Sequence, residues 1–151
     1  MATENPIVSD KPQIGKPELS LLGELRELQY NKEEFSKYFS QVEEGWYEVV
    51  NKDLRGLLVK LFSDEISNNI LTSLIEKPLT IPQIVERCEA PQTSTYRRIN
   101  MLIDSGIIRE YNFTLTKFGQ RVRSWYSIIN CVRIEFDKKM SVFVKLNLRK
   151  K

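Results

Sequence analysis

Apolar residues recur every three or four positions through much of the first two thirds of the chain, which predicts a succession of amphipathic helices. The rhythm begins near Glu18 and has three stripes: Leu21, Leu22, Leu25 and Leu28, then Phe35, Tyr38, Phe39 and Val42, then Trp46, Val49, Val50, Leu54, Leu57, Leu58 and Leu61. Asn31 is placed to cap the second stripe. We therefore expect a helical N-terminal extension over residues 18–62. It could cover the core or pair with a second copy, and we favour dimerisation for part of it.

Three more helices are expected between residues 63 and 106. Asp64 and Thr80 each precede a helical rhythm and can cap it, and Pro82 falls early in the second helix, where its missing N–H costs little. Pro91 breaks the chain before the third helix, which is expected from about residue 92 to about residue 105. Gly106 suits the left-handed position that ends many helices.

Beyond residue 106 the pattern becomes mixed. Residues 107–111 are strand-like, Asn112 and Phe113 are expected to reverse the chain, and residues 114–116 return, which makes a hairpin or wing over residues 107–117. An apolar stripe of Phe118, Val122, Trp125, Tyr126 and Ile129 predicts a helix from Lys117 to about Asn130. Residues 132–136 and 140–146 alternate on either side of a polar turn, which predicts a C-terminal β-hairpin.

Drawn on a 3.6-residue wheel, the third helix has a packing face with Thr95, Ile99 and Leu102. The opposite, polar face carries Thr93, Tyr96, Arg97 and Asn100. Arginine can grip guanine or phosphate, asparagine can pair with adenine, and hydroxyls commonly hold phosphates. Residues 92–100 contain no Asp or Glu. We predict that this segment contacts DNA through Gln92, Thr93, Ser94, Tyr96, Arg97, Arg98 and Asn100. The alternative is a polar surface helix in which Tyr96 lies partly in the core.

The wing adds three candidate DNA contacts, Arg109, Asn112 and Lys117. A basic hairpin of this kind could reach the minor groove or the phosphate backbone next to the helix. The alternative is an ordinary basic hairpin tip.

Charge is distributed unevenly along the 151 residues. The formal net charge is +3, but residues 1–60 carry −3 and residues 61–151 carry +6. A basic C-terminal half suits a polyanion, although a solvated surface of mixed sign would look the same. No apolar run is long enough for a membrane span, and residues 1–20 lack the pattern of a secretory signal. We expect a cytoplasmic protein with no membrane partner.

The chain has two cysteines, Cys88 and Cys131, and no histidine. Isolated cysteines of this kind are expected to be reduced and packed as small apolar groups. A zinc site needs clustered Cys or His, and the commonest general base is missing. We therefore expect no metal, no cofactor and no enzymatic activity.

Residues 62–108 also resemble a known family. The segment 62–74 is similar to the opening helix of ArsR-type winged helix-turn-helix regulators, 78–87 to their second helix, and 93–108 to their recognition helix and its exit into the wing. The resemblance covers about residues 60–120 and is closest to archaeal members, in which a helix and a β-hairpin follow the wing. It implies a cytoplasmic, dimeric, sequence-specific DNA-binding regulator. The chain lacks the Cys and His clusters of the metal-sensing members, so metal sensing is not carried over.

Together these observations predict a mainly α fold with a small β component (α+β), namely a winged helix-turn-helix with an N-terminal helical extension and a C-terminal β-hairpin. The expected parts are a flexible tail (1–17), the helical extension (18–62), the DNA-binding domain (63–118), a helix and β-hairpin (119–147) and a basic tail (148–151). The predicted function is transcriptional regulation by a homodimer on double-stranded DNA, with an unidentified effector. The alternatives are a protein-interaction module and a non-specific chromatin-associated DNA-binding protein.

Overall fold

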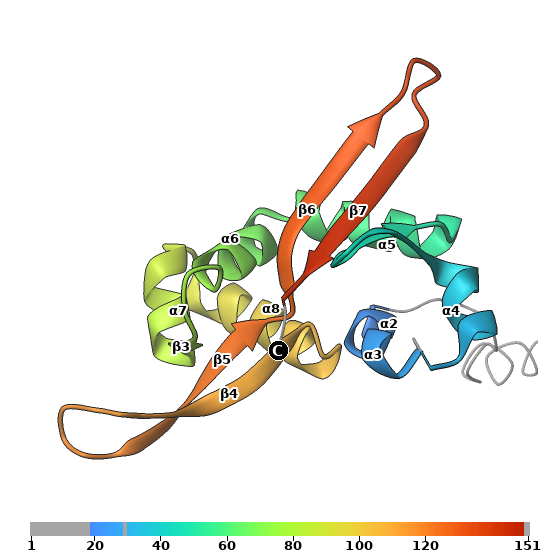
Figure 1. Ribbon diagram of the computed structural model, residues 1–151. Coiled ribbons are helices and arrows are strands. Elements are labelled where there is room, and N and C mark those ends of the chain that lie inside the picture. Colours follow the sequence, from blue (N-terminus) through green and yellow to red (C-terminus); the bar gives the residue numbers. More distant parts are fainter. Residues whose placement is uncertain (1–18, 29, 150–151) are drawn as a thin grey trace, which may run out of the picture.

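The computed structural model describes residues 19–28 and 30–149, and the predicted tail over residues 1–17 lies outside them. Groups of helices and groups of strands follow one another along the described chain (Figure 1). In order they are α2 (Ser20–Gly23), α3 (Leu25–Leu28), α4 (Lys32–Tyr38), β1 (Phe39–Glu43), β2 (Trp46–Val49), α5 (Lys52–Ser63), α6 (Glu65–Ser73), β3 (Leu79–Thr80), α7 (Ile81–Cys88), α8 (Gln92–Asp104), β4 (Ile108–Leu115), β5 (Arg121–Ser127), β6 (Ile129–Phe136) and β7 (Val142–Leu148).

The strands form two antiparallel sheets, so the prediction of a mainly α fold with a small β component was wrong. One sheet has the order β1-β2-β7-β6 and the other β3-β5-β4. The structure is 43% helix and 32% strand, which makes it an α+β fold with an extensive β part. The hairpins β4–β5 and β6–β7 extend from the body in opposite directions (Figure 1).

The three helices expected between residues 63 and 106 are present as α6, α7 and α8, and we call them the three-helix unit. The predicted caps are confirmed. The Asp64 side chain accepts the N–H of Ser67 at 3.0 Å, and Thr80 forms a capping box with Gln83. Helix α8 ends at Asp104 and is followed by Gly106 with φ of +78°, the left-handed conformation that glycine adopts without strain.

The N-terminal extension is not wholly helical. Helix α4 is capped by Asn31 as expected, but it ends at Tyr38, and the chain then makes the β1–β2 hairpin before α5 begins. Burial alternates along β2, with Tyr47 and Val49 turned inward, as one covered face of a sheet requires. Leu22 and Leu25 are fully covered, so α2 and α3 help to close the core.

The segment from Lys117 to Asn130 was predicted as a helix, which was wrong: it contains a turn, the strand β5 and the start of β6. The chain reverses at residues 116–120, where Gly119 has φ of +79° and the Thr116 hydroxyl accepts the N–H groups of Phe118 and Gln120. The expected reversal at Asn112 and Phe113 lies instead within β4. Pairing of β5 with both β4 and β3 stabilises the extended conformation over the helical one.

The C-terminal β-hairpin is confirmed, and it is longer than predicted. Strands β6 and β7 pair from Ile129 with Leu148 to Phe136 with Val142, and β7 also pairs with β2. Arg149, predicted as part of a basic tail, is half-buried and donates to the carbonyls of Leu74 and Ile75 at the end of α6. Lys150 and Lys151 lie outside the described residues.

Candidate nucleic-acid interface

Helix α8 presents its polar residues on one exposed face. Its opposite face is buried through Thr95, Ile99 and Leu102, as the wheel predicted. Because the packing face is fixed, the exposed set follows from helical geometry. It consists of Thr93, Tyr96, Arg97 and Asn100, which we call the polar ridge. Tyr96 is 43% exposed and is therefore outside the core.

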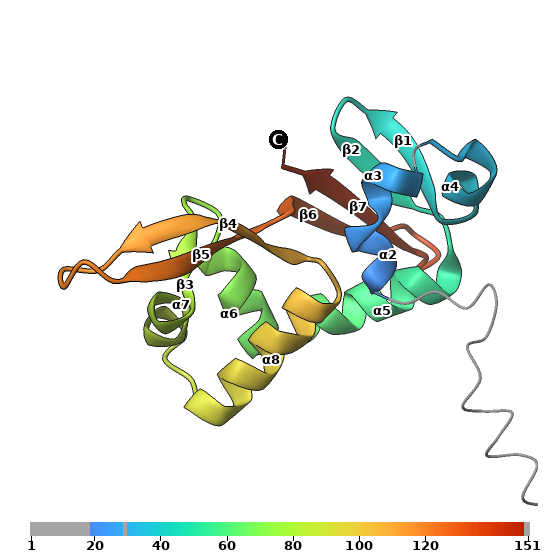
Figure 2. The ribbon, with the colours of Figure 1, turned by 90° about the horizontal axis from the view of Figure 1, so that it is seen from below.

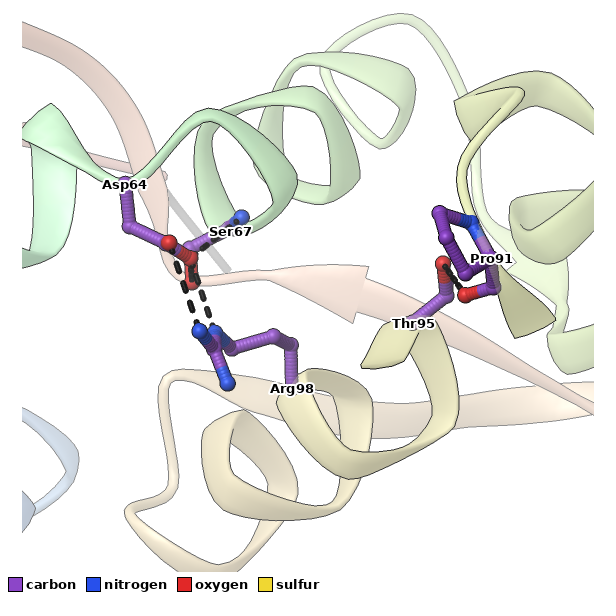
Figure 3. A network of polar contacts seen from close by, with 5 residues as sticks. All are labelled: Asp64, Ser67, Pro91, Thr95 and Arg98. Carbon is purple, nitrogen blue, oxygen red and sulfur yellow. Dashed lines mark hydrogen bonds and ion pairs between the residues drawn. The ribbon is translucent and has the colours of Figure 1, made fainter. Parts of the chain in front are cut away.

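At the start of α8, no side chain of the capping residue accepts a hydrogen bond from the first backbone N–H groups. Pro91 occupies the capping position, where it makes no side-chain hydrogen bond, and the first turn contains no acid. The Thr95 hydroxyl donates to the Pro91 carbonyl at 3.0 Å, which fixes the entry of the chain into the helix (Figure 3). Gln92 is exposed here and Ser94 is half-buried. An uncapped helix N-terminus carries partial positive charge and suits a phosphate.

Arg98 points away from the polar ridge, towards α6. Its Nε lies 2.9 Å from Oδ2 of Asp64 and its Nη2 lies 3.4 Å from Oδ1, so the contact has two points (Figure 3). Hydrogen bonds from Arg98, and next from Ser67, hold the pKa of Asp64 well below its ordinary value. Arg98 therefore fixes α8 against the cap of α6, with its charge already paired.

Two of the three predicted wing residues are exposed on the β4–β5 hairpin. Asn112 lies in β4, where its side-chain oxygen accepts the N–H of Phe113 at 2.7 Å. Lys117 lies in the turn, with its ammonium 5.4 Å from the centre of the Phe118 ring. Both side chains are accessible to a partner that approaches the hairpin.

The third wing residue, Arg109, is engaged elsewhere. Its Nε donates to the Gly106 carbonyl at 3.1 Å, and its Nη2 donates to the carbonyl of Gly23. The half-buried guanidinium thus joins α2 to the turn between α8 and β4. The structure does not bring it together with Asn112 and Lys117.

Two basic residues of the hairpin, Arg121 and Arg123, were not predicted as site residues because the sequence pattern favoured a helix there. In β5 they lie opposite Leu115 and Phe113, so these four side chains share one face of the hairpin. The Arg121 guanidinium is 5.5 Å from the centre of the Phe113 ring, and Arg123 lies 3.6 Å from Glu110. The available signal for a strand was the β-branched and aromatic content of the segment, with Val122, Trp125 and Tyr126 close together.

A groove of about 650 Å³ borders the polar ridge. Arg97 and Asn100 line it together with Met101 of α8, Leu19, and Leu57 of α5. Figure 2 shows α2 and α5 beside the C-terminal half of α8. The N-terminal part of the chain therefore forms one edge of the candidate interface.

The cysteines do not form a site. Cys88 is buried on α7 as expected, and burial raises the pKa of its thiol. Cys131 is exposed on β6, so the expectation that both would be packed was wrong for it. Among residues 19–28 and 30–149, no three Cys, Asp or Glu side chains are gathered as metal ligands. Within the same residues, no helix has the length and apolar character to cross a membrane.

Comparisons of the chain with protein-family models, with curated proteins and with solved structures found no match.

Proposed function

We propose that the chain is a sequence-specific, DNA-binding transcriptional regulator that acts as a homodimer in the cytoplasm, as the resemblance to ArsR-type regulators implies. The observation that carries the proposal is the polar ridge of α8. A guanidinium, an amide and two hydroxyl groups stand together on the exposed face of a helix that is uncapped and free of acids in its first turn. These groups can pair with base edges and phosphates in the major groove.

The β4–β5 hairpin supports the same function with a second basic surface. Lys117, Arg121 and Arg123 are exposed on it. These cations, of which Arg123 also lies 3.6 Å from Glu110, suit the phosphate backbone beside the groove that α8 would enter. We assign the hairpin to positioning and the polar ridge to sequence reading.

A second candidate function is a protein-interaction module, and exposed apolar side chains favour it. Leu115 is 68% exposed and Phe118 is 79% exposed, at the end of the hairpin. Large apolar groups at such a place mark a surface that a partner covers. Neither candidate function involves catalysis.

Selection of bound sequences from a random duplex pool tests the proposal, followed by an anisotropy titration of the recovered duplex. We expect enrichment of a site with dyad symmetry, because a two-fold dimer reads two equal half-sites. Binding with a steep salt dependence and no enrichment would favour the non-specific alternative. Absence of binding even at low salt would exclude both DNA-binding functions and leave the interaction module.

A further inference from the structure

Strand β6 is an exposed edge of the four-stranded sheet. Within the described residues it pairs only with β7, so its other side presents unpaired N–H and C=O groups. It is also the longest strand of that sheet, running from Ile129 to Phe136. An edge of this length is a template for one more strand.

One face of β6 is apolar and becomes progressively less covered towards the hairpin turn. Val132, Ile134 and Phe136 lie opposite Leu146, Val144 and Val142 of β7, so all six share a face. Val144 and Leu146 are fully buried, whereas Ile134 is 36% exposed and Phe136 is 59% exposed. The apolar face that is buried in the body of the protein therefore extends into solvent along the β6–β7 hairpin.

A groove of about 370 Å³ lies along this face, between β6 and α6. Val132 and Ile134 line one side, and Phe62, Leu71 and Ile75 line the other. Ile75 is itself 45% exposed. The groove can therefore receive an apolar side chain that arrives beside Val132.

The opposite face of β6 has a charge order that complements itself. Arg133 and Glu135 flank Ile134. When two antiparallel copies of the strand pair about a two-fold axis at Ile134, Arg133 of each copy stands opposite Glu135 of the other. The same register places Phe136 of each copy opposite Val132 of the other, at the mouth of the groove. Opposite charges and aromatic–β-branched pairs stabilise neighbouring strands.

The existing row of charges across the sheet supports this register. Glu48 of β2 lies opposite Lys145 of β7, and Lys145 lies opposite Arg133 of β6. Two cations thus follow one acid, and like charges directly opposite each other are unfavourable. Glu135 of a second copy would be the next residue in the row, and its negative charge would offset the second of the two cations.

We propose that two copies of the chain associate through their β6 edges, in this register, to form one continuous eight-stranded sheet. The other edge of the sheet, β1, lacks a self-complementary order, because Glu43 is its only charged residue. Strand β6 projects from the opposite side of the body to the β4–β5 hairpin, so both copies keep that hairpin free (Figure 1). The inference rests on the homodimer part of the proposed function and replaces residues 18–62 as the expected dimer contact.

Charge reversal tests the register without DNA. We expect the wild-type chain to be dimeric by light scattering. Arg133→Glu and Glu135→Arg should each weaken dimerisation about tenfold or more, because each creates two like-charge pairs. The double variant should dimerise more tightly than either single variant, although it does not restore the contact of the Arg133 guanidinium with the Trp46 ring, 4.6 Å away. An equimolar mixture of the two single variants should form heterodimers, because every pair at the interface is then of opposite charge.

A cross-link provides a second, independent measurement. Residues facing each other across the axis have Cα atoms about 4.5–5.5 Å apart, within reach of a disulfide. Ile134→Cys, in a Cys131→Ser background, should therefore give linked dimers under a mild oxidant. Ser40→Cys on β1, in the same background, is the matched control and should stay unlinked.

The proposed interface would be contradicted by a wild-type chain that remains monomeric, or by a dimer whose affinity is unchanged in both Arg133→Glu and Glu135→Arg. The duplex titration is read separately. A monomer that still binds duplex DNA would contradict the interface but not the DNA-binding function. A dimer that responds to the charge reversals as expected but does not bind duplex DNA would support the interface and contradict the DNA-binding function.

Discussion

Arg97 and Arg98 are adjacent in the sequence and have opposite surroundings. Arg97 is exposed on the polar ridge, while Arg98 is held by both oxygens of Asp64. The difference follows from one step of about 100° around the helix. At the residue scale, the first arginine is available to DNA and the second is part of the support of α8.

Arg97→Ala should weaken binding to the preferred duplex by about 1–3 kcal/mol, because the variant loses a donor to base edges or phosphate. Anisotropy titrations at fixed salt would measure the loss. Arg55→Ala on α5 is the matched control, and we expect it to bind like the wild type. Equal affinity of Arg97→Ala and wild type would remove Arg97 from the interface.

Asp64→Asn separates the helix cap from the ion pair. Asparagine caps a helix as well as aspartate does, so the variant keeps the cap but loses the charge and one of the two acceptor oxygens that face Arg98. We expect the free energy of unfolding at about pH 7 to fall by up to about 1 kcal/mol, the value of a partly exposed pair.

The pH dependence of that difference has a definite sign. A carboxyl whose pKa is lowered by folding adds stability above its unfolded pKa of about 3.9 and loses it as the pH falls further. Urea unfolding of both proteins between about pH 7 and about pH 2 should therefore show the gap closing in acid. A gap that is constant with pH would mean that the ion pair is not its origin.

The local roles of individual residues were the part of the structure that the sequence predicted best. The caps at Asn31, Asp64 and Thr80 and the buried face of α8 depend on local spacing, which the sequence displays directly. The contacts of Arg98 and Arg109 within the protein were not predicted, because their partners, Asp64 and Gly23, are 34 and 86 residues away. Which group a long, flexible side chain contacts depends on the tertiary structure, and local sequence patterns do not reveal it.

At the element scale, the β4–β5 hairpin differs most from its prediction. An apolar stripe at helical spacing was present over residues 117–130, but the segment is also rich in residues that favour strands, such as Val122, Trp125 and Tyr126. The ambiguity was resolved by pairing, since β5 lies between β3 and β4. A segment with both patterns takes the conformation that its neighbours stabilise.

Arg121→Ala tests the hairpin as a phosphate-binding element. Loss of one phosphate contact should lower the slope of log affinity against log salt by about 1 for each protomer, and should weaken all duplex sequences alike. Titrations at several salt concentrations give the slope. Lys138→Ala in the turn of the other hairpin is the matched control and should leave it unchanged. An unaltered slope for Arg121→Ala would show that the hairpin lies off the DNA.

The contact between α2 and the end of α8 is a second element-scale feature. A Cβ at Gly23 would lie 2.6 Å from the carbonyl oxygen of Ser105, which is backbone and cannot move aside freely. Gly23→Ala should therefore destabilise the protein by about 1–3 kcal/mol, as overpacking does.

Gly56→Ala is the control of opposite sign. This glycine lies within α5, and a Cβ there meets nothing within 4 Å. The substitution should stabilise the protein by about 0.5–1 kcal/mol, since alanine favours helix. Thermal melts of the two variants give both values, and a Gly23→Ala protein as stable as wild type would show that α2 is not packed this closely.

At the scale of the whole molecule, the four-stranded sheet was the largest surprise. It joins β1 and β2, from the first third of the chain, to β6 and β7 at its end. Tyr47 pairs with Leu146, a partner that no local pattern in the sequence reveals. The sequence could therefore predict the C-terminal hairpin but not the two strands that complete its sheet.

The position of Leu19 has a practical consequence. Leu19 lines the groove that also contains Arg97 and Asn100, so the first described residue lies beside the polar ridge. The last described residue, Arg149, is bonded at the far end of α6. A label attached at position 19 would therefore lie beside the polar ridge, whereas a label attached at position 149 would lie at the end of α6.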